Sequence, residues 1–427
     1  MIGRPVWHSP PVPRLTSVLV CSLLVVASCA SDDGSTTSTD TSPSTDAPTE
    51  SAPVSEPRAT DPPAPTATNP PSTDPPLADF APITEGEYAV GVQTITITDP
   101  TRDRPLTVDV WFPLAEGASG EPQRYSFVTG DYYESPRAVA ADSSMISPDG
   151  PFPLVVYTHG SGGLRYIHSD YTETLASHGY LVVAADHTGN TTVDQFLDTE
   201  DDGATIAFNR PRDVQVLIDE MLNPESQETV GFVGSVDPDS IAVTGHSLGG
   251  YATYAVVSGM KNEAGTVLPD ERIDALIPLA PALGDGNPES SLLTDEQLGL
   301  VVVPTLVMVG TDDKTTPVDP NVTRAFEFTA SDPLYRVDLV AAEHQSFTDV
   351  CDYLDFFPML ENPTEAVVDV VEEFAVAGCS EGDMPNDRVQ ELTNTFAVSF
   401  LDSIFKGSEM IDPEIVAIPD DVTYIIK

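Results

Sequence analysis

Short, unbroken apolar runs alternate with helix-like segments along most of this chain, and no other feature constrains its fold as much. Such runs are typical of strands that are covered on both faces, as in a parallel sheet. They are PLVVYTHG (153–160), YLVVAAD (180–186), SIAVTG (240–245), ALIPLA (275–280), TLVMVG (305–310) and YRVDLVAA (335–342). The alternation predicts an α/β fold, a mostly parallel central sheet with helices on both faces.

Two earlier runs, TITITD (94–99) and LTVDVWFP (106–113), alternate apolar and polar residues. That pattern predicts paired antiparallel strands, which would form an N-terminal edge of the sheet. The segment 186–211 is long and polar, as functional or lid-like loops often are.

The amino terminus carries export signals. Arg4 and Arg14 precede an apolar run at 15–27 that is too short to span a bilayer. Residues 1–28 are therefore predicted to be a signal peptide. The run ends in VASC, which resembles a lipobox cleaved before Cys29. A lipid on Cys29 would hold the protein on the outer side of the cell membrane, although lipidation at Cys21 and plain secretion remain alternatives.

Composition divides the rest of the chain in two. Residues 29–82 are rich in Ser, Thr, Pro and Asp with almost no large apolar side chain, so we expect a disordered tether. Residues 83–427 then form one folded domain. The chain carries 18 Lys and Arg against 68 Asp and Glu, a net charge of −50. Because phosphate contacts need a basic surface, nucleic acid is excluded as a partner.

Of the four cysteines, Cys21 leaves with the signal and Cys29 is the predicted anchor. Cys351 and Cys379 remain as a pair in an exported domain. A disulfide between them is expected in that compartment, with two free buried thiols as the alternative.

The stretch GHSLG places Ser247 between Gly245 and Gly249, after an apolar run and before a helix-like segment. A serine at a tight strand-to-helix corner projects its hydroxyl from the sheet edge, and its neighbours two positions away must be small. This pattern predicts a nucleophile elbow. The helix that follows directs its positive end toward a developing oxyanion.

A serine hydroxyl needs a base, and the chain order expected with such an elbow is serine, acid, histidine. His344 alone among the seven histidines follows Ser247. The acid should end the strand 305–310, where Asp312 and Asp313 stand. We choose Asp313 over Asp312 because its spacing from Gly310 and Pro317 fits the related pattern described below. The backbone amides of Ser161 and Leu248 are the predicted oxyanion donors.

These residues resemble the α/β-hydrolase superfamily from about residue 94 to 405. PFPLVVYTHGSGG, LASHGYLVVAADHTGN, NRPRDV and VTGHSLGGY are similar to its dienelactone-hydrolase-like branch, which includes platelet-activating-factor acetylhydrolases, chlorophyllases and cutinase-like polyesterases. VPTLVMVGTDDKTTP and AAEH are similar to the acid and histidine segments of the cutinase-like enzymes.

The chain departs from its relatives at two points. Dienelactone hydrolases carry cysteine at the elbow, where this chain has Ser247. The acetylhydrolases carry their acid one strand earlier, where the nearest carboxylate here is Asp285. The resemblance therefore implies ester chemistry without naming a substrate.

The sequence thus predicts a serine carboxylic-ester hydrolase for small-acyl or lipid-like esters, with no metal or cofactor. The alternatives are a catalytically silent binding module, or a peptidase or acyltransferase with the same triad. The oligomeric state leaves no trace in the sequence.

The residues that contact substrate stay open. The segments 186–211 and 351–379 are candidates to frame the acyl pocket. Arg210 and Arg212 either bind an anionic head group or form salt bridges. Tyr166 and His168 either line the entrance or are solvated at the surface.

Overall fold

The computed structural model describes residues 77–223, 228–287, 289–360 and 362–427. The predicted signal peptide, Cys29 and nearly all of the predicted tether lie outside them. The chain divides after Asp74, and the second unit runs from Pro75 to Lys427. Among the described residues, no helix is both long and apolar enough to cross a bilayer.

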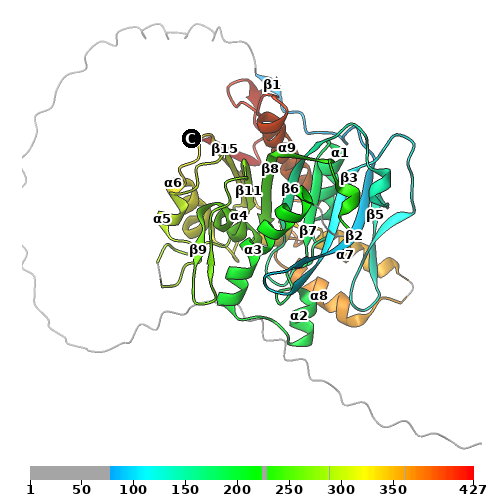
Figure 1. The fold of residues 1–427 in the computed structure, drawn as a ribbon. Helices are drawn as coiled ribbons and strands as arrows, with labels where there is room; N and C mark the ends of the chain where they lie inside the picture. Colours follow the sequence, from blue (N-terminus) through cyan, green and yellow to red (C-terminus); the bar gives the residue numbers. More distant parts are fainter. Residues whose placement is uncertain (1–76, 224–227, 288, 361) are drawn as a thin grey trace, which may run out of the picture. The chain divides into compact units, whose positions relative to one another are not determined.

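An 11-stranded sheet runs through the described residues, in the order β15-β13-β12-β11-β8-β6-β7-β3-β2-β5-β4 (Figure 1). Its strands are β2 (Val90–Asp99), β3 (Arg104–Pro113), β4 (Pro122–Ser126), β5 (Tyr132–Ala140), β6 (Phe152–Thr158), β7 (Leu181–Ala185), β8 (Val236–His246), β11 (Ala275–Leu279), β12 (Thr305–Gly310), β13 (Leu334–Leu339) and β15 (Val422–Ile426). Two short pairs stand apart: β1 (Ala78–Asp79) with β14 (Val416–Ala417), and β9 (Met260–Lys261) with β10 (Thr266–Val267).

The predicted parallel core is confirmed. Strands β7, β6, β8, β11, β12 and β13 are neighbours and pair in parallel. The two alternating runs form the antiparallel pair β2 and β3, with Thr96 opposite Thr107. The sheet extends further than the sequence indicated, because β15 pairs antiparallel with β13 at one end and β5 and β4 continue beyond β2 at the other.

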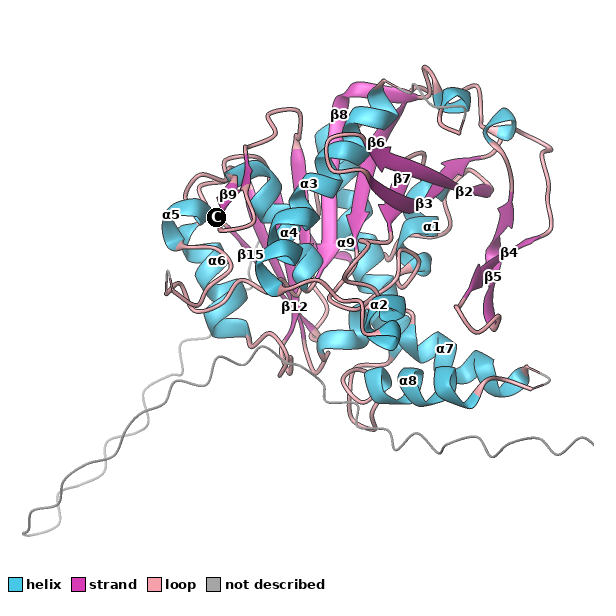
Figure 2. Ribbon diagram, turned by 60° about the horizontal axis from the view of Figure 1, so that its bottom comes forward, coloured by secondary structure: helices cyan, strands magenta, loops and turns pink. Residues whose placement is uncertain are grey.

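Helices cover both faces of this sheet (Figure 2). They are α1 (Ser169–Ser177), α2 (Thr192–Leu197), α3 (Gly203–Leu222), α4 (Leu248–Ser258), α5 (Asp295–Leu298), α6 (Arg324–Phe328), α7 (Val350–Phe356), α8 (Glu365–Ala375) and α9 (Asn386–Phe405). Single turns occur at η1 (Ser143–Met145), η2 (Val230–Phe232), η3 (Asp319–Thr323), η4 (His344–Phe347) and η5 (Phe357–Met359).

Strand β6 shows how the apolar runs build two cores. Leu154 and Val156 pack into the cluster that contains side chains of α3 and α4. Val155 and Tyr157 pack into the opposite cluster, with side chains of α1 and α9. Because successive strand residues point to opposite faces, an unbroken apolar run serves both layers.

Two predicted boundaries need correction. The folded unit begins before residue 83, because Ala78 and Asp79 pair with β14 and the Phe80 ring lies 5.9 Å from that of Phe396. The segment 186–211 is not one long loop. It contains α2 and the first turns of α3, which starts at Gly203 because the Asp202 side chain caps it by accepting from the Thr205 amide.

Candidate active site

Ser247 stands at the corner between β8 and α4. Its φ is 57° and its ψ is −117°, a conformation that a residue with a side chain rarely adopts. The Ser247 amide donates to Leu279 O at 2.9 Å, and its carbonyl accepts from the Ala282 amide at 2.9 Å. These bonds to the end of β11 hold the strained corner, and the Ser247 side chain stays partly exposed.

The two flanking glycines are required by the approach of β6. A Cβ on Gly249 would lie 1.9 Å from the carbonyl oxygen of Thr158. One on Gly245 would lie 2.5 Å from Thr158 Cγ2 and 2.7 Å from the Gly249 backbone. No larger residue fits either position without separating β6 from α4.

Asp313 and His344 meet at the ends of neighbouring strands. His344 begins η4 after β13, and its Nδ1 lies 2.8 Å from Oδ2 of Asp313 in the loop after β12. The amides of Thr315 and Thr316 donate to Asp313 Oδ1 at 2.9 and 2.7 Å. Asp312 is exposed, and its carboxylate accepts from the Thr311 hydroxyl at 3.1 Å.

Thr316 is a residue of this cluster that the sequence reasoning missed. Its hydroxyl lies 2.8 Å from Asp313 Oδ2 and 3.2 Å from His344 Nδ1, and it donates to Ala280 O at 3.1 Å. Its position in DDKTTP could have indicated this contact, because a threonine three residues after the acid can form a hydrogen bond back to it.

His246 joins the histidine loop to the elbow. Its Nε2 donates to the backbone oxygen of His344 at 2.9 Å, and the two rings are 4.5 Å apart. Burial, followed by the charge of His344, lowers the pKa of His246 well below its usual value. A neutral His246 therefore sits directly before Ser247. Within the described residues, the Ser247 hydroxyl and the His344 ring share no hydrogen bond.

The predicted oxyanion loop lies against Ser247. A Cβ on Gly160 would be 3.3 Å from Ser247 Cβ, so the turn after β6 packs on the elbow. Ser161 in that turn is exposed, and its amide bonds to no described residue. Leu248 is the first residue of α4, where an amide has no acceptor within its own helix. The residue after Ser247 and the turn packed on it thus each contain an amide with no backbone partner among the described residues.

Arg210 lies beneath this loop and not at a surface. It is fully buried within α3 and donates to Gly160 O at 2.9 Å. The expectation of a head-group site or a salt bridge therefore does not describe Arg210. Arg212 is partly exposed, donates to Gln215 Oε1 at 3.0 Å and lies 3.9 Å from Asp99 Oδ2, so the salt-bridge alternative is confirmed for Arg212.

Tyr166 and His168 line no entrance. Both are at most 2% exposed, and the Tyr166 hydroxyl donates to Ser126 O at 2.8 Å. They belong to the packing beneath the turn, so the surface interpretation of these two residues is also wrong.

The disulfide Cys351–Cys379 is present, with Cα atoms 5.7 Å apart. It joins the start of α7 to the chain just beyond α8. These helices form a separate apolar cluster that includes Tyr353, Phe357 and Val371. The disulfide thus holds together the two ends of the segment 351–379, which follows His344.

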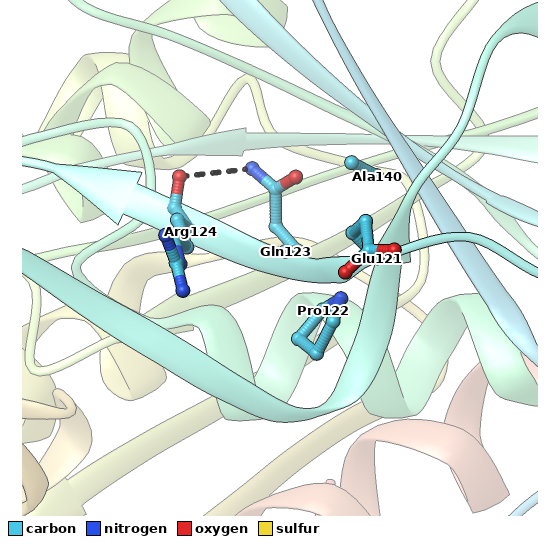
Figure 3. Close-up of a pocket in the computed structure, with 5 residues that line it drawn as sticks. All are labelled: Glu121, Pro122, Gln123, Arg124 and Ala140. Atoms are coloured by element: carbon cyan, nitrogen blue, oxygen red, sulfur yellow. Dashed lines mark hydrogen bonds between the residues drawn. The ribbon is translucent and has the colours of Figure 1, made fainter.

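A hollow elsewhere on the protein has no part in this arrangement. Glu121, Pro122, Gln123, Arg124 and Ala140 line it beside the edge strand β4 (Figure 3). The amide of Gln123 donates to the backbone oxygen of Arg124 at 3.4 Å. None of the predicted site residues lines this hollow.

Parts of the chain are similar in sequence to known proteins, and its fold is similar to that of a solved structure. Residues 100–207 match the family model for platelet-activating factor acetylhydrolase, isoform II. The platelet-activating factor acetylhydrolase of Cavia porcellus is 24% identical over 198 residues, which is 37% of this chain and 45% of that protein. A putative phospholipase A2 of Schizosaccharomyces pombe is 26% identical over 102 residues, 22% of this chain and 23% of that protein.

The matched regions thus span less than half the length of these relatives. Among solved structures, a ferulic acid esterase from Streptomyces cinnamoneus superimposes with a TM-score of 0.57 at 22% identity, over 82% of this chain and 99% of that one. The protein therefore has the α/β-hydrolase fold, and its sequence is related to the platelet-activating factor acetylhydrolase family.

Proposed function

We propose that this protein is a serine carboxylic-ester hydrolase that acts through Ser247, His344 and Asp313. The observation that carries the proposal is the 2.8 Å bond between Asp313 Oδ2 and His344 Nδ1, next to a serine held in an elbow conformation. The ester-cleaving enzymes named among the relatives support the same chemistry.

In the proposed mechanism, Asp313 holds the His344 ring with Nδ1 protonated, so that Nε2 is free to accept a proton. Ser247 rotates its hydroxyl toward Nε2 when an ester binds, since hydrogen bonds of this kind often tighten only in the substrate complex. Ser247 Oγ attacks the ester carbonyl while its proton passes to His344. The amides of Ser161 and Leu248 stabilise the oxyanion.

The second half of the reaction reverses these roles. His344 gives its proton to the alcohol, which leaves, and an acyl-enzyme remains on Ser247. A water molecule, deprotonated by His344, then attacks the acyl group and releases the acid. As the acid leaves, His344 returns this proton to Ser247 Oγ, which restores the free serine and the neutral histidine.

The proposed substrates are small-acyl or lipid-like esters, because esters are what the named relatives cleave. Hydrolysis of p-nitrophenyl acetate, butyrate and a long-chain ester is the test. Ser247→Ala should abolish turnover, and a fluorophosphonate should label the wild-type protein but not this variant. Turnover that survives Ser247→Ala contradicts the proposal, and no hydrolysis by the wild type favours a silent module.

We propose in addition that a lipid on Cys29 anchors the enzyme to the outer side of the cell membrane. The basic residues before the apolar run at 15–27, together with VASC at its end, support this. Detergent phase partitioning of the expressed protein tests it. The wild type should enter the detergent phase and Cys29→Ala the aqueous phase, whereas equal partitioning of the two overturns the anchor.

A further inference from the structure

We propose that Arg210 is a positioning residue of the reaction, whose guanidinium orients the peptide group that carries the Ser161 amide. This inference rests on the proposed function, because it assigns a role to the oxyanion loop of that same site. It concerns a side chain that touches neither the serine nor the histidine.

Arg210 donates to two backbone oxygens of this loop and to Asn190 in the loop after β7. Its Nη1 donates to His159 O, its Nη2 donates to Gly160 O at 2.9 Å, and its Nε donates to Asn190 Oδ1 at 3.2 Å. The side chain is 0% exposed and forms no ion pair with a carboxylate of the described residues. A buried charge held by neutral oxygens is uncommon, because burial without a charged partner is unfavourable.

Charge is nevertheless retained on this guanidinium. Burial lowers the pKa of Arg210 to about 9, and the negative charge of Asp213 opposes that shift. Arg210 is therefore still protonated at neutral pH. Asp213 is in turn bonded to Arg104 and to His187, whose Nδ1 lies 2.9 Å from Asp213 Oδ2.

The geometry of the peptide group connects Arg210 to the reaction. The group between Gly160 and Ser161 is trans and planar, so its C=O and N–H point in opposite directions. Gly160 O is held by Arg210, by His159 Nδ1 at 2.7 Å and by the Gly163 amide at 3.2 Å. The Ser161 N–H is thereby directed away from Arg210.

Asn190 forms hydrogen bonds on both sides of the same peptide group. Its Oδ1 accepts from Arg210, and its Nδ2 donates to Ser161 Oγ at 3.2 Å and to Glu200 Oε1 at 2.8 Å. The Asn190 side chain thus links the Arg210 guanidinium to Ser161, the residue whose amide Arg210 orients. Rigid donors of this kind stabilise an oxyanion without rearranging during the reaction.

Arg210→Lys is the test, because one ammonium group cannot bridge His159 O, Gly160 O and Asn190 at once. Arg324→Lys is the matched control. Arg324 is a second buried arginine that donates to backbone oxygens, Gly284 O at 2.8 Å and Leu293 O. Unlike Arg210 it also pairs with a carboxylate, that of Asp295 at 2.8 Å, and it bonds to no described residue of the oxyanion loop. Asn190→Ala is a milder variant that keeps the guanidinium.

Four measurements are made on each folded variant: kcat and KM with p-nitrophenyl butyrate, the inhibition constant of a trifluoromethyl ketone, and hydrogen exchange at 159–163. In Arg210→Lys, kcat should fall roughly a hundredfold with KM within about threefold, as for a lost oxyanion donor. The ketone should bind more weakly by a similar factor, because its adduct carries the oxyanion. Asn190→Ala should lose about tenfold in kcat.

Exchange at 159–163 should be faster in Arg210→Lys and unchanged in Arg324→Lys. If the two lysine variants lose kcat equally, or if the ketone binds equally well to both, the inference is overturned. If the wild type cleaves no ester, the proposed function fails. In that case unchanged exchange in Arg210→Lys still overturns the inference, and faster exchange still supports the clamp on the loop.

Discussion

The Nδ1 atom of His344 lies 2.8 Å from Oδ2 of Asp313, although 30 residues and the whole of β13 separate their loops in the chain. The Thr315 and Thr316 amides occupy the other carboxylate oxygen. Asp313 is therefore fixed before any substrate arrives, and it determines which ring nitrogen of His344 carries the proton.

Exchanging Asp313 for asparagine should inactivate the enzyme, while the same exchange at Asp312 should not. An amide at 313 presents N–H to His344 Nδ1 and favours the tautomer in which Nε2 is protonated and cannot act as a base. We expect kcat to fall on the order of 10³ to 10⁴-fold in Asp313→Asn. Asp312→Asn should stay within about twofold, because its carboxylate is exposed. A greater loss in Asp312→Asn would reverse the assignment.

Gly249→Ala should destabilise the whole domain. The added methyl would stand 1.9 Å from Thr158 O, so β6 and α4 must move apart. Overpacking of this kind costs about 3 kcal/mol or more. Chemical denaturation measures the loss. Gly299→Ala is the control, because a Cβ there meets its nearest atom at 3.4 Å. Equal stability of the two variants would show that the elbow tolerates a side chain.

Removing the disulfide should loosen the segment that follows His344. Cys351 and Cys379 are 28 residues apart, and a bridge that closes a loop of that length stabilises the fold by about 3.5 kcal/mol, because it restricts the unfolded chain. The Cys351→Ser/Cys379→Ser double variant should unfold at lower denaturant, with faster hydrogen exchange at 350–379. A reductant should shift the wild type by the same amount and leave the double variant unchanged. A wild type that is insensitive to reductant contradicts this prediction.

The central fold was predictable because strands buried on both faces leave an uninterrupted apolar signal. The start of α3 could not be predicted from the sequence. Pro211 and the acidic residues before Gly203 are unfavourable within a helix, and the helix is stabilised by its Asp202 cap and by tertiary packing. Strand β15 was not predicted because most of its residues are exposed at a sheet edge.

The site was predictable only in part. Spacing and chain order pointed to Ser247, His344 and Asp313, because strand ends of a parallel sheet gather at one edge. The role of Arg210 could not be predicted, because nothing in its local sequence indicates that its charged group is buried. Its contacts join the turn after β6 and the loop after β7 to the middle of α3. Such a role follows from tertiary structure alone.

Glu173 on α1 should make the stability of the domain depend on pH. It is 2% exposed, accepts from the Tyr125 hydroxyl at 2.7 Å and the Ser135 hydroxyl at 2.9 Å, and lies 3.6 Å from Arg137 Nε. Burial raises its pKa from 4.5 to about 7, against the opposing charge of Arg137. Between these values the folded protein keeps a proton that the unfolded chain releases.

Stability should therefore fall as pH rises from 4.5 to about 7 and change no further through this group above that range. Glu173→Gln resembles the protonated form at every pH. Its free energy of unfolding, relative to wild type, should rise by roughly 3 kcal/mol between pH 4.5 and 7.5. Glu116→Gln, an exchange at an exposed glutamate, controls for the loss of one negative charge. Denaturant unfolding at several pH values measures both variants, and parallel pH profiles for Glu173→Gln and wild type would show that Glu173 does not titrate in this interval.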